Sequence, residues 1–253
     1  MEKPLLEISG VTMTFGGLMA LNDVSSRVYP QQIKGIIGPN GAGKTTLFNV
    51  VTGIYRPTAG DIRLKGESLV GLKPNEVAGK GIARTFQTIR LFGGMTALEN
   101  VMLGRHLRTR AGFVSAGLRL PRARREEQAS RAEALRLLEL VGLADKADED
   151  AVNLPFGMQR TLEIARALAS RPSVLILDEP ASGLNLTERQ SLAALIRQLR
   201  DDGATIVLVE HDMDLVMDLV DDILVLVYGT RLAEGPPQEI QENEAVIAAY
   251  LGN

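Results

Sequence analysis

The chain has 253 residues, of which 45% are hydrophobic and 23% charged, so it can build a sizeable globular core and is not typical of a disordered or fibrous protein. Its 28 Lys and Arg residues against 31 Asp and Glu residues give a formal net charge of -3, so no general basic field indicates nucleic-acid binding. The absence of cysteine excludes disulfides, thiolate metal sites and a cysteine nucleophile.

The amino-terminal residues predict a small antiparallel sheet. Residues 5–15 and 24–29 alternate apolar with polar positions, as half-buried antiparallel strands do. Residues 1–10 lack the basic start and apolar stretch of a secretory signal, and no apolar run approaches the ~20 residues that a membrane span needs. We therefore expect a soluble chain.

A strand, a loop and a helix follow. Residues 32–38 predict a short apolar strand that ends in glycine, and residues 44–52 have the apolar spacing of a helix. Residues 174–177 and 205–209 are rich in Leu and β-branched residues without alternation, which is typical of strands buried on both faces of a parallel sheet. Residues 186–199 predict a helix between these strands, so the pattern favours a doubly wound α/β core.

The middle of the chain differs from this pattern. From residue 96 to residue 169 the spacing is helical, without a convincing strand, and is interrupted at Gly142 and around Gly157. We interpret this segment as a helical subdomain. It contains His106, which has no identifiable partner, and a basic stretch formed by Arg105, Arg108, Arg110, Arg119, Arg122, Arg124 and Arg125. The basic stretch is compatible with contact to anionic lipid headgroups and equally with a solvated helical face.

Residues 38–45, Gly-Pro-Asn-Gly-Ala-Gly-Lys-Thr, match the spacing Gly-x-x-x-x-Gly-Lys-Ser/Thr of a phosphate-binding loop. They lie between a predicted buried strand and a helix start, where glycines let backbone amides crowd around phosphate oxygens. Lys44 would reach the terminal phosphates, and Thr45 would offer its hydroxyl to magnesium. An ordinary glycine-rich turn is the alternative. The predicted binding residues of this loop are Gly38, Pro39, Asn40, Gly41, Ala42, Gly43, Lys44, Thr45 and Thr46.

Polar residues also follow the two later buried strands. Asp178 continues from its strand and is placed to hold magnesium, whereas Glu179 projects farther and can accept a proton from attacking water. The alternative is an acidic pair at a helix amino terminus. His211 would face the same end of the sheet, although such a histidine, taken alone, is more often an ordinary polar residue than a catalytic one.

In this order the motifs resemble those of the nucleotide-binding subunit of an ATP-binding cassette (ABC) transporter, and the resemblance covers essentially the whole chain. It implies a P-loop NTPase (RecA-like) α/β core with an amino-terminal antiparallel β subdomain and an inserted α-helical subdomain at about residues 90–165. The chain, residues 1–253, would then be a single ABC ATPase domain.

The resemblance assigns roles to the motif residues, with ATP and Mg²⁺ as cofactors. Residues 38–45 resemble the Walker A loop, and residues 174–179 resemble Walker B followed by the catalytic glutamate. Gln87, in Arg84-Thr-Phe-Gln, resembles the glutamine that contacts magnesium and the attacking water, and His211 resembles the switch histidine. The implied catalytic residues are Glu179, His211, Gln87 and Lys44, and the implied magnesium ligands are Thr45, Gln87 and Asp178.

Three further positions concern the base and the dimer. Phe15 stands where the family stacks an aromatic ring on adenine, with an ordinary core aromatic as the alternative. The signature loop, usually Leu-Ser-Gly-Gly-Gln, is replaced by Leu154-Pro-Phe-Gly-Met, which has no serine hydroxyl. Since Pro155 also lacks an amide hydrogen, contact across a dimer to the other subunit's phosphate would depend on Gly157. Asn185 stands where the dimer-facing loop commonly has Asp.

Shorter phrases resemble importers of branched-chain amino acids, in particular the larger of their two ATPase subunits. These phrases, besides the long Arg-rich insertion, are residues 15–17, 81–87, 90–92, 95–101, 162–168 and 246–252. Relatives that take up urea or amides, or that export lipopolysaccharide, are the alternatives. A soluble ABC ATPase and a small-molecule kinase are less consistent with the chain, because it has no second cassette or coiled-coil insertion and a kinase has no need of Glu179, Gln87 and His211 together.

The resemblance also implies partners. Two ATPase subunits, identical or different, would enclose ATP between them and act on transmembrane permease subunits, and indirectly on a periplasmic or extracellular solute-binding protein. Nucleic acid is not implied. Gln87 and residues 90–95 would form a groove for a cytoplasmic helix of the permease. The chain would then lie peripherally on the cytoplasmic face of the inner, or plasma, membrane.

Overall fold

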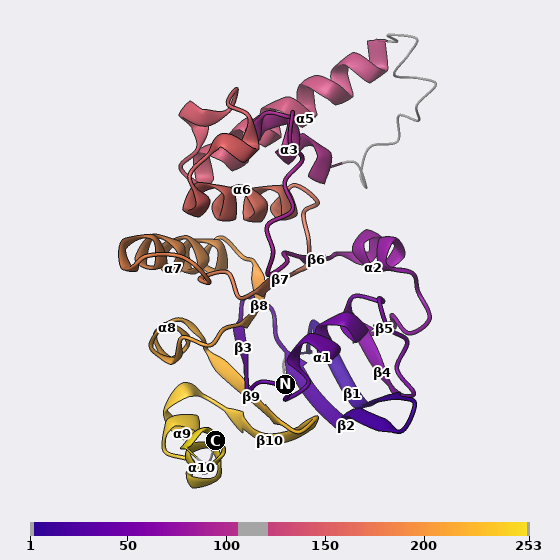
Figure 1. The fold of residues 1–253 in the computed structure, drawn as a ribbon. Coiled ribbons are helices and arrows are strands. Elements are labelled where there is room, and N and C mark those ends of the chain that lie inside the picture. The colour runs from indigo at the N-terminus through magenta and orange to yellow at the C-terminus, as the bar shows by residue number, and fades with distance from the viewer. Residues whose placement is uncertain (1–2, 106–120, 252–253) are drawn as a thin grey trace.

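The computed structural model describes residues 3–105 and 121–251, which form two β-sheets, their covering helices and a separate helical layer (Figure 1). The first sheet is antiparallel, with strand order β2-β1-β4-β5. Its strands are β1 (Leu6–Phe15), β2 (Leu18–Val28), β4 (Ala59–Leu64) and β5 (Glu67–Ser68). The predicted amino-terminal antiparallel sheet is therefore confirmed, and two later strands extend it.

The second sheet has the order β10-β9-β3-β8-β7-β6. Its strands are β3 (Ile33–Ile37), β6 (Ile82–Arg84), β7 (Val174–Asp178), β8 (Thr205–Val209), β9 (Asp222–Val227) and β10 (Thr230–Gly235), with only β10 antiparallel to its neighbour. Every residue of β3, β7 and β8 is buried, as predicted for strands covered on both faces. The carboxyl ends of these parallel strands meet at one edge, which brings their following loops together.

Alternate residues of this sheet enter two apolar cores. On one face, Ile36 and Val207 pack with the first sheet and with Phe48 of α1 (Lys44–Val51). On the other face, Leu175 and Leu208 pack with α7 (Leu186–Asp201), α8 (Met213–Leu219), α9 (Pro237–Gln241) and α10 (Glu244–Leu251). Helix α2 (Pro74–Lys80) precedes β6. The helices predicted at residues 44–52 and 186–199 are thus α1 and α7.

A helical subdomain with its own apolar core lies at one end of the second sheet (Figure 1). It contains α3 (Ala97–Gly104), α5 (Pro121–Leu140), α6 (Phe156–Leu168) and short 3-10 turns at Ala144–Lys146 and Ala151–Asn153. Gly142, with φ of 73°, follows α5 as predicted. The second predicted interruption, around Gly157, is also present, and Gly157 itself lies in the first turn of α6. The break falls at Leu154 and Pro155, which are not helical.

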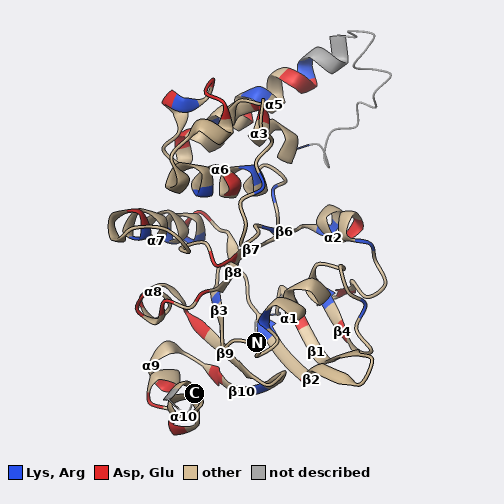
Figure 2. Ribbon diagram, in the orientation of Figure 1, with Lys and Arg blue, Asp and Glu red and all other residues tan. Residues whose placement is uncertain are grey.

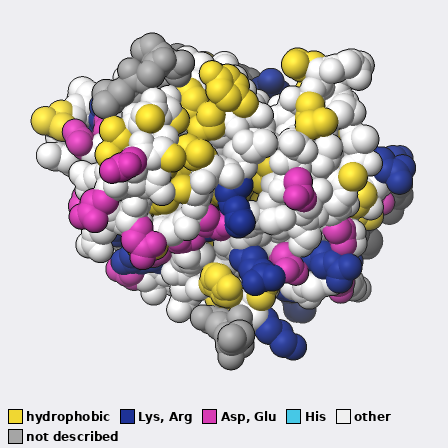
Figure 3. All heavy atoms as spheres, turned by 90° about the horizontal axis from the view of Figure 1, so that it is seen from below, with side chains coloured by type: hydrophobic (Ala, Val, Ile, Leu, Met, Phe, Trp, Pro, Cys, Tyr) yellow, Lys and Arg dark blue, Asp and Glu magenta, His cyan; other side chains and the backbone are white. Residues whose placement is uncertain are grey.

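Most of the Arg-rich stretch, with His106 and the apolar residues Phe113, Leu118 and Leu120, lies outside the described residues. Within the described ranges no helix is both long and apolar enough to traverse a bilayer. Acidic and basic residues are interspersed along the ribbon (Figure 2), and on the face seen in Figure 3 the described basic side chains alternate with acidic and apolar ones.

A buried ionic cluster joins the two sheets. Lys34 of β3 is 1% exposed and pairs with Asp222 and Glu234 at the ends of β9 and β10. Glu234 also accepts hydrogen bonds from Ser26 Oγ of β2, at 2.6 Å, and from Arg231 Nη1, at 2.8 Å. Burial alone would raise the pKa of Glu234, but the hydrogen bonds from Lys34 and Ser26 hold it below the usual value. The lowered pKa favours the charged carboxylate of Glu234, which through Ser26 links β2 to the second sheet.

We expect Lys34→Met to lower the free energy of unfolding by about 3 kcal/mol, because it leaves two carboxylates without their buried cation. Urea denaturation of the purified chain measures this change. The matched control is Arg27→Met, whose exposed ion pair with Glu7 should contribute at most about 1 kcal/mol. Equal losses for the two variants would contradict the assignment of the cluster as a fastening between sheets.

Candidate functional site

The phosphate loop between β3 and α1 adopts a conformation that only glycine tolerates at two positions. Gly38 and Gly43 have φ of 152° and 100°. A Cβ atom on Gly38 would lie 2.1 Å from the carbonyl oxygen of Leu226, and one on Gly43 would lie 2.8 Å from that of Ala20. Gly43 caps α1 without a side-chain hydrogen bond, so the first amides of this helix remain directed at the loop. This is the geometry that receives phosphate oxygens.

Lys44 lies inside the loop. Its Nζ donates to the carbonyl oxygens of Gly38, at 2.6 Å, and Pro39, at 3.0 Å. Burial lowers the pKa of Lys44, and the charges of Glu179 and Asp178 oppose that shift. The electrostatic contact places the lysine and both carboxylates in one site, as the sequence predicts.

Glu179 is the centre of a hydrogen-bonded triad. Its Oε2 accepts from Gln87 Nε2 at 2.8 Å, and its Oε1 lies 2.5 Å from His211 Nε2. The φ of Glu179 is 48°, a conformation uncommon for a residue with a side chain and often associated with functional sites. Three of the predicted catalytic residues, from three separate segments, therefore meet at one carboxylate.

Asp178 has other partners than this triad. Its Oδ2 pairs with Arg84 Nη2 at 2.7 Å, and its amide donates to Thr85 Oγ1 at 3.4 Å. Of the three predicted magnesium ligands, Gln87 therefore donates to Glu179, and Asp178 is paired with Arg84.

The oxygen donors fit magnesium. Thr45 and Asp178 supply a hydroxyl and a carboxylate, and within residues 3–105 and 121–251 no group of three or more His, Cys, Asp or Glu residues is arranged to hold a metal by itself. Magnesium commonly uses one or two protein oxygens together with water and substrate phosphates. A hydroxyl and a carboxylate are thus donors that this ion accepts.

A cavity of about 610 Å³ lies against the phosphate loop. Its lining comes from the loop, from the ends of β7 and β8, and from an apolar wall, and comprises Phe15, Leu18, Met19, Ala20, Asn40, Gly41, Ala42, Gly43, Lys44, Thr45, Thr46, Glu179, His211 and Tyr228. Phe15 lines this wall and its ring meets that of Tyr55 edge-on, with centroids 5.1 Å apart. The cavity therefore combines an apolar end with a phosphate-binding end, as a nucleotide requires.

Tyr228 is a lining residue that the sequence does not single out. It is 82% exposed and has φ of 48° in the turn between β9 and β10. The next residue, Gly229, fixes this turn to the site, since its amide donates to Ala42 O and its carbonyl accepts from the Asn22 amide. The sequence around Tyr228 indicates a Tyr-Gly turn after a strand, but it does not predict that this turn lines the cavity.

Gly157 does not line this cavity. A Cβ atom at Gly157 would lie 2.5 Å from Glu188 Oε1, and one at Gly183 would lie 2.9 Å from the ring of Phe156. The start of α6 therefore packs on the first turn of α7 and on the segment before it in the same chain. Asn185 caps the amino terminus of α7 by accepting a hydrogen bond from the Glu188 amide at 3.0 Å. Asp, the common residue at this position, is an equally good cap.

Two buried charged residues, absent from the sequence motifs, hold the site segments in place. Arg160 of α6, 2% exposed, donates to the carbonyl oxygens of Phe86 and Gln87, both at 2.9 Å. Glu210 accepts from the amides of Ala181 and His211, and burial raises its pKa despite these hydrogen bonds. The first links the glutamine segment to the helical subdomain, and the second joins the loops that follow β7 and β8.

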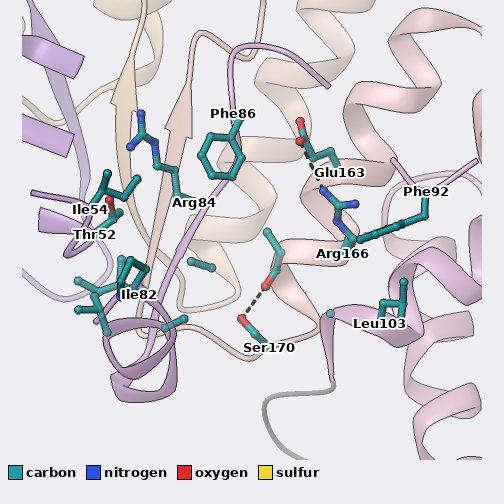
Figure 4. Close-up of a pocket in the computed structure, with 16 residues that line it drawn as sticks. Thr52, Ile54, Ile82, Arg84, Phe86, Phe92, Leu103, Glu163, Arg166 and Ser170 are labelled. Atoms are coloured by element: carbon teal, nitrogen blue, oxygen red, sulfur yellow. Dashed lines mark hydrogen bonds and ion pairs between the residues drawn. The ribbon is translucent and has the colours of Figure 1, made fainter. Parts of the chain in front are cut away.

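A second cavity, of about 490 Å³, separates β6 and α2 from α3 and α6 (Figure 4). Phe86, Phe92 and Leu103 contribute apolar surface, and Arg166 lies over the Phe92 ring at 5.7 Å. We call this cavity the subdomain groove. Of the residues from which a permease groove is predicted, Gln87 and 90–95, Phe92 alone lines this cavity, next to Phe86.

A model described as ABC transporter matches residues 21–182. The chain belongs to the ABC transporter family. A second model, described as branched-chain amino acid ATP-binding cassette transporter, matches residues 230–253. As an ABC cassette the chain is an ATPase subunit of the transporter class, and the predicted P-loop NTPase fold is confirmed.

The matches extend over whole proteins. The cassette is 48% identical over 253 residues to the high-affinity branched-chain amino acid transport ATP-binding protein BraF of Pseudomonas aeruginosa, covering 100% of this chain and 99% of that protein. Identity to the protein of the same description, LivG, of Escherichia coli K12 is 47% at the same coverage. A solved nucleotide-free ATP-binding cassette from an ABC transporter has a TM-score of 0.86 and 29% identity, covering 99% of this chain and 100% of that one. A dimeric post-hydrolysis cassette bound to ADP and phosphate has a TM-score of 0.77 and 26% identity, covering 92% and 98%.

We expect Tyr228→Ala to weaken ADP binding roughly 10-fold, because aromatic stacking on a base is worth about 1–3 kcal/mol and each 1.4 kcal/mol is a factor of ten. Isothermal titration calorimetry of the cassette measures this loss. Tyr228→Phe should retain binding, and inorganic tripolyphosphate, which has no base, should bind all variants alike. Unchanged ADP binding, or an equal loss for tripolyphosphate, would contradict a role of Tyr228 at the base end of the cavity.

Proposed function

We propose that the cassette is the ATP-hydrolysing subunit of an importer for branched-chain amino acids. The observation that carries this assignment is the 47–48% identity, over essentially the full length of both chains, to two transport ATPases described by that solute. A second segment, residues 230–253, lies outside the ABC transporter match, and its match to the branched-chain model also supports the assignment.

The site supports a hydrolytic role for the Glu179 triad. Gln87 and His211 hold the two carboxylate oxygens of Glu179, so its free lone pairs point in a fixed direction and can take a proton from water. Lys44 and the loop amides would bind the phosphates, and Phe15 would stack on adenine. Magnesium, which Thr45 and Asp178 would hold, neutralises phosphate charge when it is bound.

A complete site would need a second ATPase subunit. Gly157 lies outside the cavity of its own chain, and with its serine replaced by Pro155 the signature loop would contact the partner's nucleotide through Gly157 and the start of α6. ATP would favour the closed pair over the open one, and only that difference in affinity can do work on permease subunits. The cassette would sit peripherally on the cytoplasmic face of the membrane, beneath the permease and, across the membrane, a solute-binding protein.

We expect Glu179→Gln to keep ATP binding and to lower turnover about 100-fold or more, because a positioned general base contributes at least that factor. Phosphate release and size-exclusion chromatography with ATP measure turnover and the accumulation of an ATP-bound dimer. The matched control is Glu67→Gln, an exposed carboxylate paired with Lys80. Turnover at the wild-type rate in Glu179→Gln would remove this residue from the mechanism.

We expect Phe92→Ala to reduce the amount of permease that co-purifies with the cassette, because Phe92 is 54% exposed in the subdomain groove and offers apolar surface to a permease helix. Basal ATP hydrolysis of the isolated chain should be unchanged. The control is Ile247→Ala, an exposed apolar residue on α10. Intact co-purification and solute-stimulated turnover in Phe92→Ala would mean that the permease docks elsewhere.

The function is tested by isolating the tagged cassette from its native membranes with nucleotide and identifying its partners. Two hydrophobic permeases and a second ATPase, with turnover stimulated by leucine and not by urea, would support the proposal. Stimulation by urea or amides, a bridge to the outer envelope, or the absence of any membrane partner would each overturn it in favour of a different ABC system.

A further inference from the structure

Arg84, the last residue of β6, reaches both the site and the subdomain groove. Its side chain is 6% exposed. Nη2 donates to Asp178 Oδ2 at 2.7 Å, and Nη1 donates to Asn49 Oδ1 of α1 at 2.8 Å. The guanidinium thus joins the strand that carries Asp178 to the helix that follows the phosphate loop. The same residue lines the subdomain groove (Figure 4).

Two aromatic rings hold the guanidinium in this position. Its central carbon lies 5.4 Å from the centroid of Phe48 and 5.3 Å from that of Phe86. Phe48 is fixed in the core, whereas Phe86 lines the groove, and Figure 4 shows its ring between Arg84 and Phe92. An occupant of the groove that displaces Phe86 therefore removes one of the two contacts that set the position of Arg84.

The backbone makes this position sensitive to the helical subdomain. Strand β6 is an edge strand that pairs only with β7, where Arg84 lies opposite Ile176. After Thr85, whose amide donates to Ile176 O, the chain leaves the sheet, and Arg160 of α6 binds the carbonyls of Phe86 and Gln87. Arg84 thus lies where the chain passes from the sheet to a segment that is bound to α6.

The remaining polar group of Arg84 has no partner among the described residues. Its Nε is buried without a hydrogen bond. A buried donor left in this state costs free energy, so the position is set by the two Nη contacts and the two rings. An unpartnered buried donor is expected where one side chain contacts two sites at once.

We propose that Arg84 is a positioning residue that couples the subdomain groove to Asp178. With Phe86 in its present place, Arg84 holds Oδ2 of Asp178, which restrains this carboxylate and leaves its other oxygen as the one that would hold a magnesium ion. Displacement of Phe86 by a groove occupant loosens Arg84 and, through it, Asp178. The inference rests on the proposed function for the identity of the occupant, a permease helix, but not for the contact between Arg84 and Asp178.

The test is a double-mutant cycle read by Mn²⁺ binding. Free Mn²⁺ is followed by electron paramagnetic resonance in solutions of the full chain with a non-hydrolysable ATP analogue, so no turnover, solute or permease is needed. Arg84→Met should raise the Mn²⁺ concentration at half-saturation roughly 10-fold, since partners of metal-ligating carboxylates typically contribute 10–100-fold in affinity. Arg84→Lys should not restore it, because an ammonium cannot bridge Asp178 and Asn49.

Phe86→Leu tests the groove side of the coupling without touching Asp178. It should shift Mn²⁺ half-saturation in the same direction, and the double variant should be no weaker than Arg84→Met alone, because both changes act through one residue. Phe92→Leu, in the same groove but without contact to Arg84, is the matched control and should bind Mn²⁺ as the wild type does.

Wild-type Mn²⁺ binding in Arg84→Met, full rescue by Arg84→Lys, or additive losses in the double variant would each overturn the coupling. If Arg84→Met does not fold by thermal melting, Arg84→Lys and Phe86→Leu form the cycle with the same readout. A failed importer assignment leaves this result unchanged, because the measurement contains neither solute nor permease.

Discussion

The rest of the cassette depends on one constraint, the close approach of the backbones of both sheets to the backbone of the phosphate loop. The second sheet approaches Gly38 through the carbonyl of Leu226, and the first sheet approaches Gly43 through that of Ala20. Neither approach leaves room for a Cβ atom. The loop is therefore held directly between the two sheets, and the packing of one sheet on the other determines the direction in which the amides of α1 point.

The same edge of the second sheet gathers the chemistry around Glu179. Gln87 comes from the segment that leads into the helical subdomain, and His211 follows β8, so two separate segments of the fold contact one carboxylate. Each partner has a buried support of its own, Arg160 for the glutamine segment and Glu210 for the histidine loop. The geometry around Glu179 thus depends on several supporting residues that act on one acceptor.

The local motifs could be predicted from the sequence and the long-range contacts could not. The phosphate loop and the residues after β7 are contiguous stretches, so the spacing of their residues predicts their function. Buried strands such as β8 are recognised as unbroken apolar runs. Strands β5 and β6 have two and three residues, which is too short for any period to appear. Arg84 and Asp178 are 94 positions apart, and no local pattern joins them. The break predicted around Gly157 is present, and Pro155, just before α6, lies at it.

The contacts of Arg160 have a consequence for modular exchange between cassettes. Arg160 of α6 donates hydrogen bonds to the carbonyls of Phe86 and Gln87. The boundary of the helical subdomain therefore lies before residue 86 and not at the start of α3. A chimera cut at the visible helix boundary would separate a buried guanidinium from its acceptors. A chimera cut after Thr85 would keep the glutamine and its arginine together, although it would divide the groove, because Ile82 and Arg84 also line it.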